Sequence, residues 1–114
     1  MTALGRRLPI TLGTVVPVAE SATQHIRNAL MLLSLLSEAH PFVPAFHPEI
    51  SRAERRAHAA LTMVEHHAPA HFAVAHLEKA ILTLLEAELA WDVLPEVPAA
   101  IGRLLRALFA LDHP

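Results

Sequence analysis

Residues 18–39, VAESATQHIRNALMLLSLLSEA, form the stretch that decides the fold. At about 100° per residue, a helix over 18–39 carries one apolar side and a second apolar set nearly opposite to it. The first set comprises Ala22, Ile26, Ala29, Leu30, Leu33 and Leu36, and the second comprises Met31, Leu32, Leu35 and Ala39. Helices that are apolar around most of their circumference lie in the centre of large cores or in membranes. Because neither setting suits a lone bundle of 114 residues, we expect part of this helix to contact another protein chain.

The composition indicates one domain that is mostly helical. A chain of 114 residues can bury a single modest core. Its hydrophobic share of 54% is high for a soluble monomer, and Ala and Leu, which favour helix, supply most of the excess. The longest uncharged stretches, 8–19 and 28–37, are shorter than the roughly 18 apolar residues of a membrane-spanning helix. We therefore predict no transmembrane span and expect a cytoplasmic protein.

Prolines divide the chain after this first helix. Residues 41–48, PFVPAFHP, are predicted to be an apolar connector, because proline lacks a backbone donor and biases its predecessor toward extended backbone. A second helix is expected to begin near Pro48 or Ser51, where Ser51 and Glu54 have capping-box spacing, and to end near Ala68. Its inward face reads Ile50, Ala53, Ala57, Leu61, Val64 and Ala68.

A break, rather than a kink, is predicted at Pro69. The apolar stripe moves by about half a turn there, so a separate third helix is expected over 69–94. After a turn at 95–98, Pro98 suits the first position of a fourth helix. That helix is expected to bury Ile101, Leu104, Leu105, Leu108 and Phe109. Short connections of this kind favour an all-α, antiparallel bundle of about four helices.

Residues 1–17 are predicted to be an extended N-terminal arm, followed by a single helical-bundle domain over 18–114. Prolines and β-branched residues suit extended backbone better than helix. The apolar side chains of the arm, Leu8, Ile10, Leu12, Val15 and Val16, would lie along the surface of a neighbouring chain. The alternative is a secretion signal beginning at Arg6 and Arg7, which is disfavoured because two prolines and a glycine interrupt its short apolar stretch.

The first functional hypothesis is a small protein-interaction subunit, either an obligate homo-oligomer or an accessory component of a hetero-complex. Its candidate interface residues are Met31, Leu32, Leu35, Phe42, Phe46, Glu88 and Trp91. Trp91 is expected to be a core or interface anchor. Glu88 would project from the apolar face of the third helix, where an unpaired carboxylate is costly. An ion pair that sets partner specificity is favoured there over a catalytic acid.

The alternative hypothesis is a helical metal-binding protein or metal-dependent enzyme. Its candidate zinc or iron ligands are Glu54, His58, Glu65, His67 and His71, because imidazole and carboxylate groups are common ligands of both metals. Glu54, His58 and Glu65 share one helix face, but His67 and His71 straddle Pro69. A solvated Glu54–His58 pair beside histidines at a helix junction explains the pattern more simply. We therefore expect no cofactor.

A third hypothesis concerns His76, which lies three residues before Lys79. This spacing is similar to that in histidine-phosphotransfer bundles, which place a lysine shortly after an exposed phospho-accepting histidine. The resemblance implies a signalling bundle with His76 as acceptor. Those bundles usually have glycine next to the lysine, and Ala80 occupies that place here. An ordinary solvent-facing histidine explains the same residues.

The charge pattern argues against nucleic acid as a partner. The formal net charge is −2, so the chain has no general attraction for polyanions. Arg52, Arg55 and Arg56 are candidates for a local basic patch, with Arg103 and Arg106 as further candidates. Neither a glycine-bearing helix-turn-helix nor interleaved aromatic residues accompany them. Nine histidines make the charge of the chain sensitive to acid, and the absence of cysteine excludes disulfides and thiolate chemistry.

Overall fold

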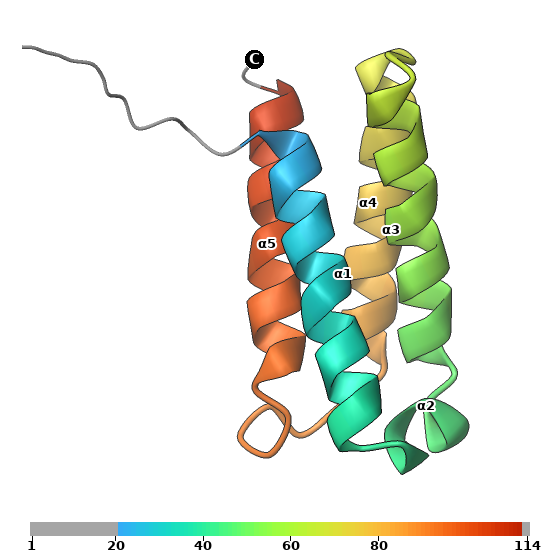
Figure 1. The fold of residues 1–114 in the computed structure, drawn as a ribbon, viewed down its shortest axis with the longest axis vertical. Helices are drawn as coiled ribbons and strands as arrows, with labels where there is room; N and C mark the ends of the chain where they lie inside the picture. The colour runs from blue at the N-terminus through green and yellow to red at the C-terminus, as the bar shows by residue number, and fades with distance from the viewer. Residues whose placement is uncertain (1–20, 113–114) are drawn as a thin grey trace, which may run out of the picture.

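The computed structural model describes residues 21–112, which form an antiparallel bundle of four long helices with one short helix at its end (Figure 1). The helices are α1 (Ala22–Ala39), α2 (Phe42–Phe46), α3 (Glu49–Glu65), α4 (Ala70–Glu86) and α5 (Glu96–Asp112). Successive long helices run in opposite directions. The predicted all-α bundle of about four helices is confirmed. The predicted arm, 1–17, lies outside the described residues.

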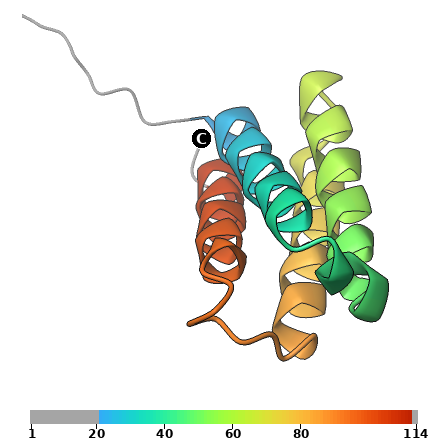
Figure 2. The ribbon, with the colours of Figure 1, turned by 60° about the horizontal axis from the view of Figure 1, so that its bottom comes forward.

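The bundle consists of two closely packed helix pairs. α1 packs most extensively on α5, and α3 on α4, while the α1–α3 and α4–α5 contacts are smaller (Figure 2). Small side chains permit close approach of the helix backbones. The alanines that are fully buried are Ala29, Ala53, Ala57, Ala60, Ala80, Ala100 and Ala107. The larger side chains that fill the remaining core are Ile26, Leu33, Leu36, Ile50, Leu77, Leu84, Val97 and Leu104.

Only one side of α1 is covered by the other described helices. The helix begins after Ser21, whose side chain accepts a hydrogen bond from the backbone N–H of Gln24 at 3.2 Å. The first apolar set is buried except for Leu30, which is half-buried. In the second set, Leu32 is half-buried, whereas Met31 and Leu35 are exposed. The predicted surplus of apolar surface on this helix is therefore present.

The predicted connector at 41–48 contains a short helix, which was not foreseen from the sequence. α2 spans five residues after Pro41. The first backbone N–H groups of any helix have no partner within that helix, so Pro44, at the third position, costs no hydrogen bond. Pro41 precedes the helix and Pro44 lies in its first turn, so neither proline interrupts it.

α3 begins at Glu49, and the predicted capping box at Ser51 does not form. Ser51 lies inside the helix, and no side chain caps its N-terminus. α3 ends at Glu65, three residues before the predicted end at Ala68. His67 then adopts a left-handed backbone with φ 57°, which reverses the chain before α4. The predicted break before Pro69 is confirmed.

α4 ends at Glu86, eight residues before the predicted end at Leu94. Glu88 has a left-handed backbone, φ 53°, and the chain then turns so that Leu89 and Leu94 are buried in the core. A helix continuing to Leu94 would leave too few residues to reverse direction before α5. Helical periodicity continues through 87–94 in the sequence, but the geometry of an antiparallel connection prevails.

α5 begins at Glu96 rather than at the predicted Pro98. A carboxylate in the first turn interacts favourably with the helix dipole, and Pro98, at the third position, needs no intrahelical donor. Ile101 and Leu104 are buried as predicted and Leu108 is half-buried, whereas Leu105 and Phe109 are exposed, contrary to expectation. No helix within 21–112 combines the length and apolar character needed to cross a membrane.

Replacing Leu104 with alanine should strongly destabilise the bundle. Leu104 is 0% exposed, and truncation of a buried leucine typically costs about 2–5 kcal/mol through lost burial and the resulting cavity. The matched control is Leu105→Ala, because Leu105 is 51% exposed and should lose less than about 1 kcal/mol. Urea unfolding of both variants measures the difference, and equal losses would contradict the orientation of α5.

Replacing Gly102 with alanine should stabilise the protein. Gly102 lies within α5, and a Cβ added there would have no atom within 4 Å. Alanine is favoured over glycine in a helix interior by roughly 0.5–1 kcal/mol. We expect the free energy of unfolding to rise by that amount in urea titrations. A decrease would contradict the open space around this position.

Candidate interaction surfaces

Three of the five Phe and Trp residues of the chain project from one end of the bundle. Phe42 and Phe46, each 75% exposed, extend from α2, and Trp91, 46% exposed, lies in the connection between α4 and α5. α2 and this connection occupy the same end (Figure 1). Val93 adds a fourth exposed apolar side chain there. We call these four residues the aromatic end.

Two further exposed apolar side chains lie on α1, in the half of the helix nearer the aromatic end. Leu35 lies about one turn before the last residue of α1, and Met31 lies one further turn away. Both side chains point away from the core, whereas Leu32 packs partly against it. The predicted interface residues of α1 are thus two exposed side chains and one half-buried side chain.

Glu88 does not lie on a helix face, so that part of the prediction was wrong. It follows the end of α4 in a left-handed conformation, and its side chain is exposed. Its backbone N–H donates to the carbonyl oxygen of Leu85 at 3.4 Å. The exposed carboxylate lies in the same connection as Trp91, so it is polar surface beside the aromatic end.

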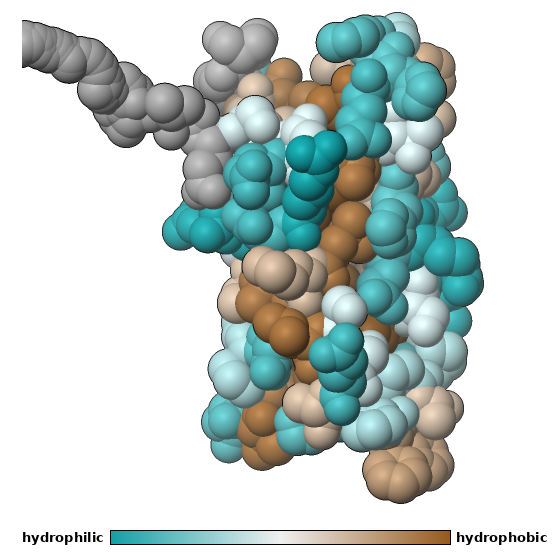
Figure 3. Space-filling view, viewed as in Figure 1, coloured by the Kyte–Doolittle hydropathy of each residue, from teal (hydrophilic) through white to brown (hydrophobic). Residues whose placement is uncertain are grey.

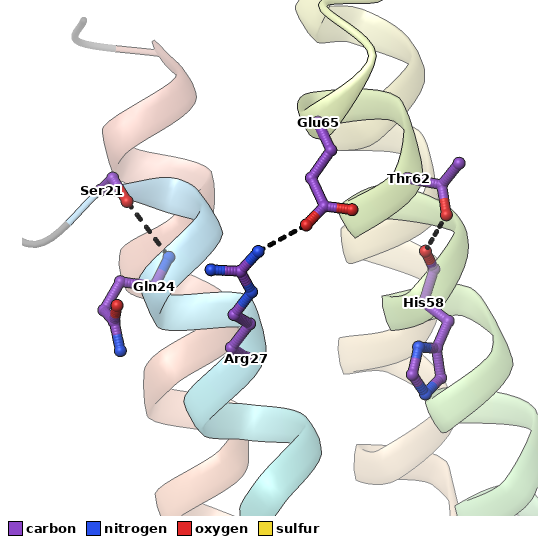
Figure 4. A network of polar contacts seen from close by, with 6 residues as sticks. All are labelled: Ser21, Gln24, Arg27, His58, Thr62 and Glu65. Carbon is purple, nitrogen blue, oxygen red and sulfur yellow. Dashed lines mark hydrogen bonds and ion pairs between the residues drawn. The ribbon is translucent and has the colours of Figure 1, made fainter.

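The candidate metal ligands do not converge on one point. Glu65 forms an ion pair with Arg27 of α1, with 2.6 Å between Oε2 and the guanidinium Nη2 (Figure 4). His67 lies in the turn after α3, and the ring of His71 packs against Phe72 with centroids 4.2 Å apart. Among residues 21–112, no three His, Asp or Glu side chains are grouped so that they could hold a metal ion.

The Arg27–Glu65 ion pair links the two helix pairs on the surface. Figure 3 shows apolar surface along the line where α1 meets α3, with polar side chains on both sides of it. Arg27 of α1 reaches toward Glu65 of α3 at the end of this line near the α3–α4 turn (Figure 4). Both side chains are substantially exposed, so the pair contributes at most about 1 kcal/mol.

The carboxyl group of Glu54, on α3, has a raised pKa. Partial burial disfavours its charged form and raises the pKa of the carboxyl group above 4.5, while the nearby His58 opposes this increase. The predicted i, i+4 relation between the two side chains is therefore reflected in the electrostatics of α3.

A buried polar contact between α1 and α5 was not predicted from the sequence. His25 is almost fully buried, and its Nδ1 lies 3.2 Å from Nη1 of the half-buried Arg103. His25 occupies a core-facing position of α1. His25 lies between Gln24 and Ile26, and a single histidine in this setting is compatible with a solvent-facing position as well as a buried one.

The predicted basic residues divide between the two helix pairs. Arg56 of α3 contacts His76 of α4, with 3.2 Å between Nη1 and Nδ1. Arg52 and Arg55 line the same hollow between α3 and α4, about 350 Å³ in volume. Arg103 belongs to the α1–α5 pair, so it does not extend this patch. His76 is half-buried and in contact with an arginine, which differs from the predicted open, solvent-facing position.

The chain matches no family model, and comparisons with curated proteins and with solved structures find no match either.

Replacing Glu54 with glutamine should change the pH dependence of stability. Because the folded-state pKa of Glu54 is raised, its contribution to stability is present below pH 4.5 and is lost as pH rises through the folded-state pKa. The stability advantage of E54Q should therefore grow as pH increases. Urea unfolding from acidic to neutral pH measures it, in an H58Q background that removes the coupled histidine. A pH-independent difference would contradict the assignment.

Proposed function

We propose that this chain is a small helical protein-interaction subunit, which works as an oligomer or as an accessory component of a larger assembly. The observation that carries the proposal is the exposure of Phe42, Phe46 and Trp91 at one end of the bundle. Aromatic side chains are enriched in protein interfaces, and tryptophan is the residue most often found at energetic hot spots.

The size of the aromatic end supports this proposal. A large aromatic side chain buries roughly 150–250 Å², and a stable interface buries roughly 800 Å² on each partner. Three aromatic side chains with Val93 therefore supply a large part of one interface. Met31 and Leu35 on α1 add two exposed apolar side chains that could belong to the same interface.

The surroundings of the aromatic end support a protein partner. Glu88 and Asp92 are exposed close to Trp91, and His40 is exposed next to α2. An apolar centre with a polar rim is the usual composition of a protein interface. The rim would pair with polar groups of the partner, while the aromatic side chains would be removed from water. Self-association and binding to a different protein are both consistent with this chemistry.

Replacing Phe42 and Phe46 with serine should dissociate the protein from itself or from its partner. Loss of an interface anchor typically weakens binding by at least about 30-fold. Native mass spectrometry of protein purified from its own host would report an assembly for the wild type and the isolated chain for the double variant. Circular dichroism should still show a folded helical chain, since neither side chain is part of the core of the bundle.

The control is Phe72→Ser, because Phe72 is also exposed but lies in the first turn of α4, at the opposite end of the bundle. This variant should keep the wild-type assembly. A folded double variant with the wild-type mass would exclude the aromatic end as the interface. A wild-type protein that is monomeric and carries no partner would overturn the proposed function.

A further inference from the structure

Three hollows on the surface around α4 lie next to one another, because each shares two lining residues with its neighbour. The first lies between α3 and α4 and is lined by Arg52, Arg55, Arg56, Ala59 and His76. The second lies over the exposed side of α4, shares Arg56 and His76 with the first, and is also lined by Ala75, Glu78, Lys79 and Leu82. The third lies between α4 and α5 and is lined by Glu78, Ile81, Leu82, Leu105 and Leu108. We call the three together the α4 furrow.

The α3 side of the furrow is cationic. Arg52, Arg55, Arg56 and Lys79 line it, and they are four of the nine Lys and Arg residues of a chain whose net charge is −2. Within residues 21–112, no carboxylate lies within ion-pair distance of any of these four. Arg52 and Arg56 are four residues apart on one helix, a spacing at which like charges destabilise the helix. An anion bound there would relieve this repulsion.

The α5 side of the furrow is apolar. Leu82 is 53% exposed and Leu105 is about as exposed, and these two side chains flank a hollow of about 380 Å³ between α4 and α5. Ala75, a small residue, lies where the furrow crosses α4, so a bound chain can approach the helix backbone closely. The furrow therefore changes from cationic to apolar along its length. At 8–10 Å between neighbouring helix axes, that length is roughly 16–20 Å.

We propose that the α4 furrow binds a segment of a partner protein that carries carboxylates at one end and bulky apolar side chains at the other. The carboxylates would pair with Arg52, Arg56 and Lys79, and the apolar side chains would cover Leu82 and Leu105. The inference rests on the proposed function as an interaction subunit and names the chemistry of one partner. Its site is separate from the aromatic end.

The charges of this chain disfavour two other occupants. Residues 8–16, LPITLGTVV, contain no carboxylate with which to neutralise the cationic side of the furrow. A second copy packed through the same face would offer the four cationic side chains little negative charge, because Glu78 is the one carboxylate among the described residues that line the furrow. A different protein that carries both acidic and apolar side chains fits both sides of the furrow.

The probe is a fluorescein-labelled peptide with four acidic residues, a Gly-Ser spacer and four residues of leucine and phenylalanine. Fluorescence anisotropy with the full chain should show saturable binding that weakens with added salt. R52E/R56E should weaken it by at least 10-fold, and L82S/L105S by at least 5-fold. R106E is the charge control, since Arg106 is exposed outside the furrow, and it should change the affinity less than 2-fold.

Several results would overturn the inference. One is the absence of saturable peptide binding to the wild-type chain. Another is wild-type affinity of the peptide for both furrow variants, R52E/R56E and L82S/L105S. A third is a loss of affinity in R106E as large as that in R52E/R56E. A peptide with only the acidic half that binds equally well would show a simple anion site, and duplex DNA that displaces the probe would show a nucleic-acid surface. Repeating the titrations with the F42S/F46S variant separates this site from the proposed function, because loss of assembly should leave peptide binding unchanged.

Discussion

The burial of α1 is the constraint on which the rest of the structure depends. Its core-facing side chains need two neighbouring helices, and α5 and α3 provide them. Alanines such as Ala57 and Ala107 let these helices approach closely, but alanines contribute little apolar volume. Four helices with small core residues leave some large apolar side chains without cover. The exposed leucines and aromatic residues on several faces follow from this shortage of core volume.

The sequence predicted the parts of the fold that depend on periodicity and on proline. It identified α1, the break before Pro69 and the antiparallel bundle, because a 3.6-residue pattern and a missing N–H donor act locally. It failed at the end of α4, where the need to reverse direction overrides helical periodicity. It also failed at α2, because proline is tolerated in a first turn. Both errors concern connections, whose geometry is set by the helices that they join.

The sequence also predicted part of the candidate interaction surfaces, but not all of them. Large apolar residues in a small chain indicated surplus surface, and Phe42, Phe46 and Trp91 are exposed. Whether that surface is an interface stays a prediction. The α4 furrow could not be foreseen, because it needs side chains from three helices whose neighbours are fixed only by packing. Sequence spacing showed Arg52, Arg55 and Arg56 as a group but not their proximity to His76 and Lys79.

The pairing of α1 with α5 has a consequence for synthesis on the ribosome. α3 and α4 are joined by a short turn, so this hairpin can form as soon as both have emerged. α1 emerges first, but its most extensive partner is the last helix in sequence. Until α5 has emerged from the ribosome, the apolar side of α1 is exposed to water, to chaperones and to other nascent chains. An assembly partner present during translation would therefore meet α1 before α5 does.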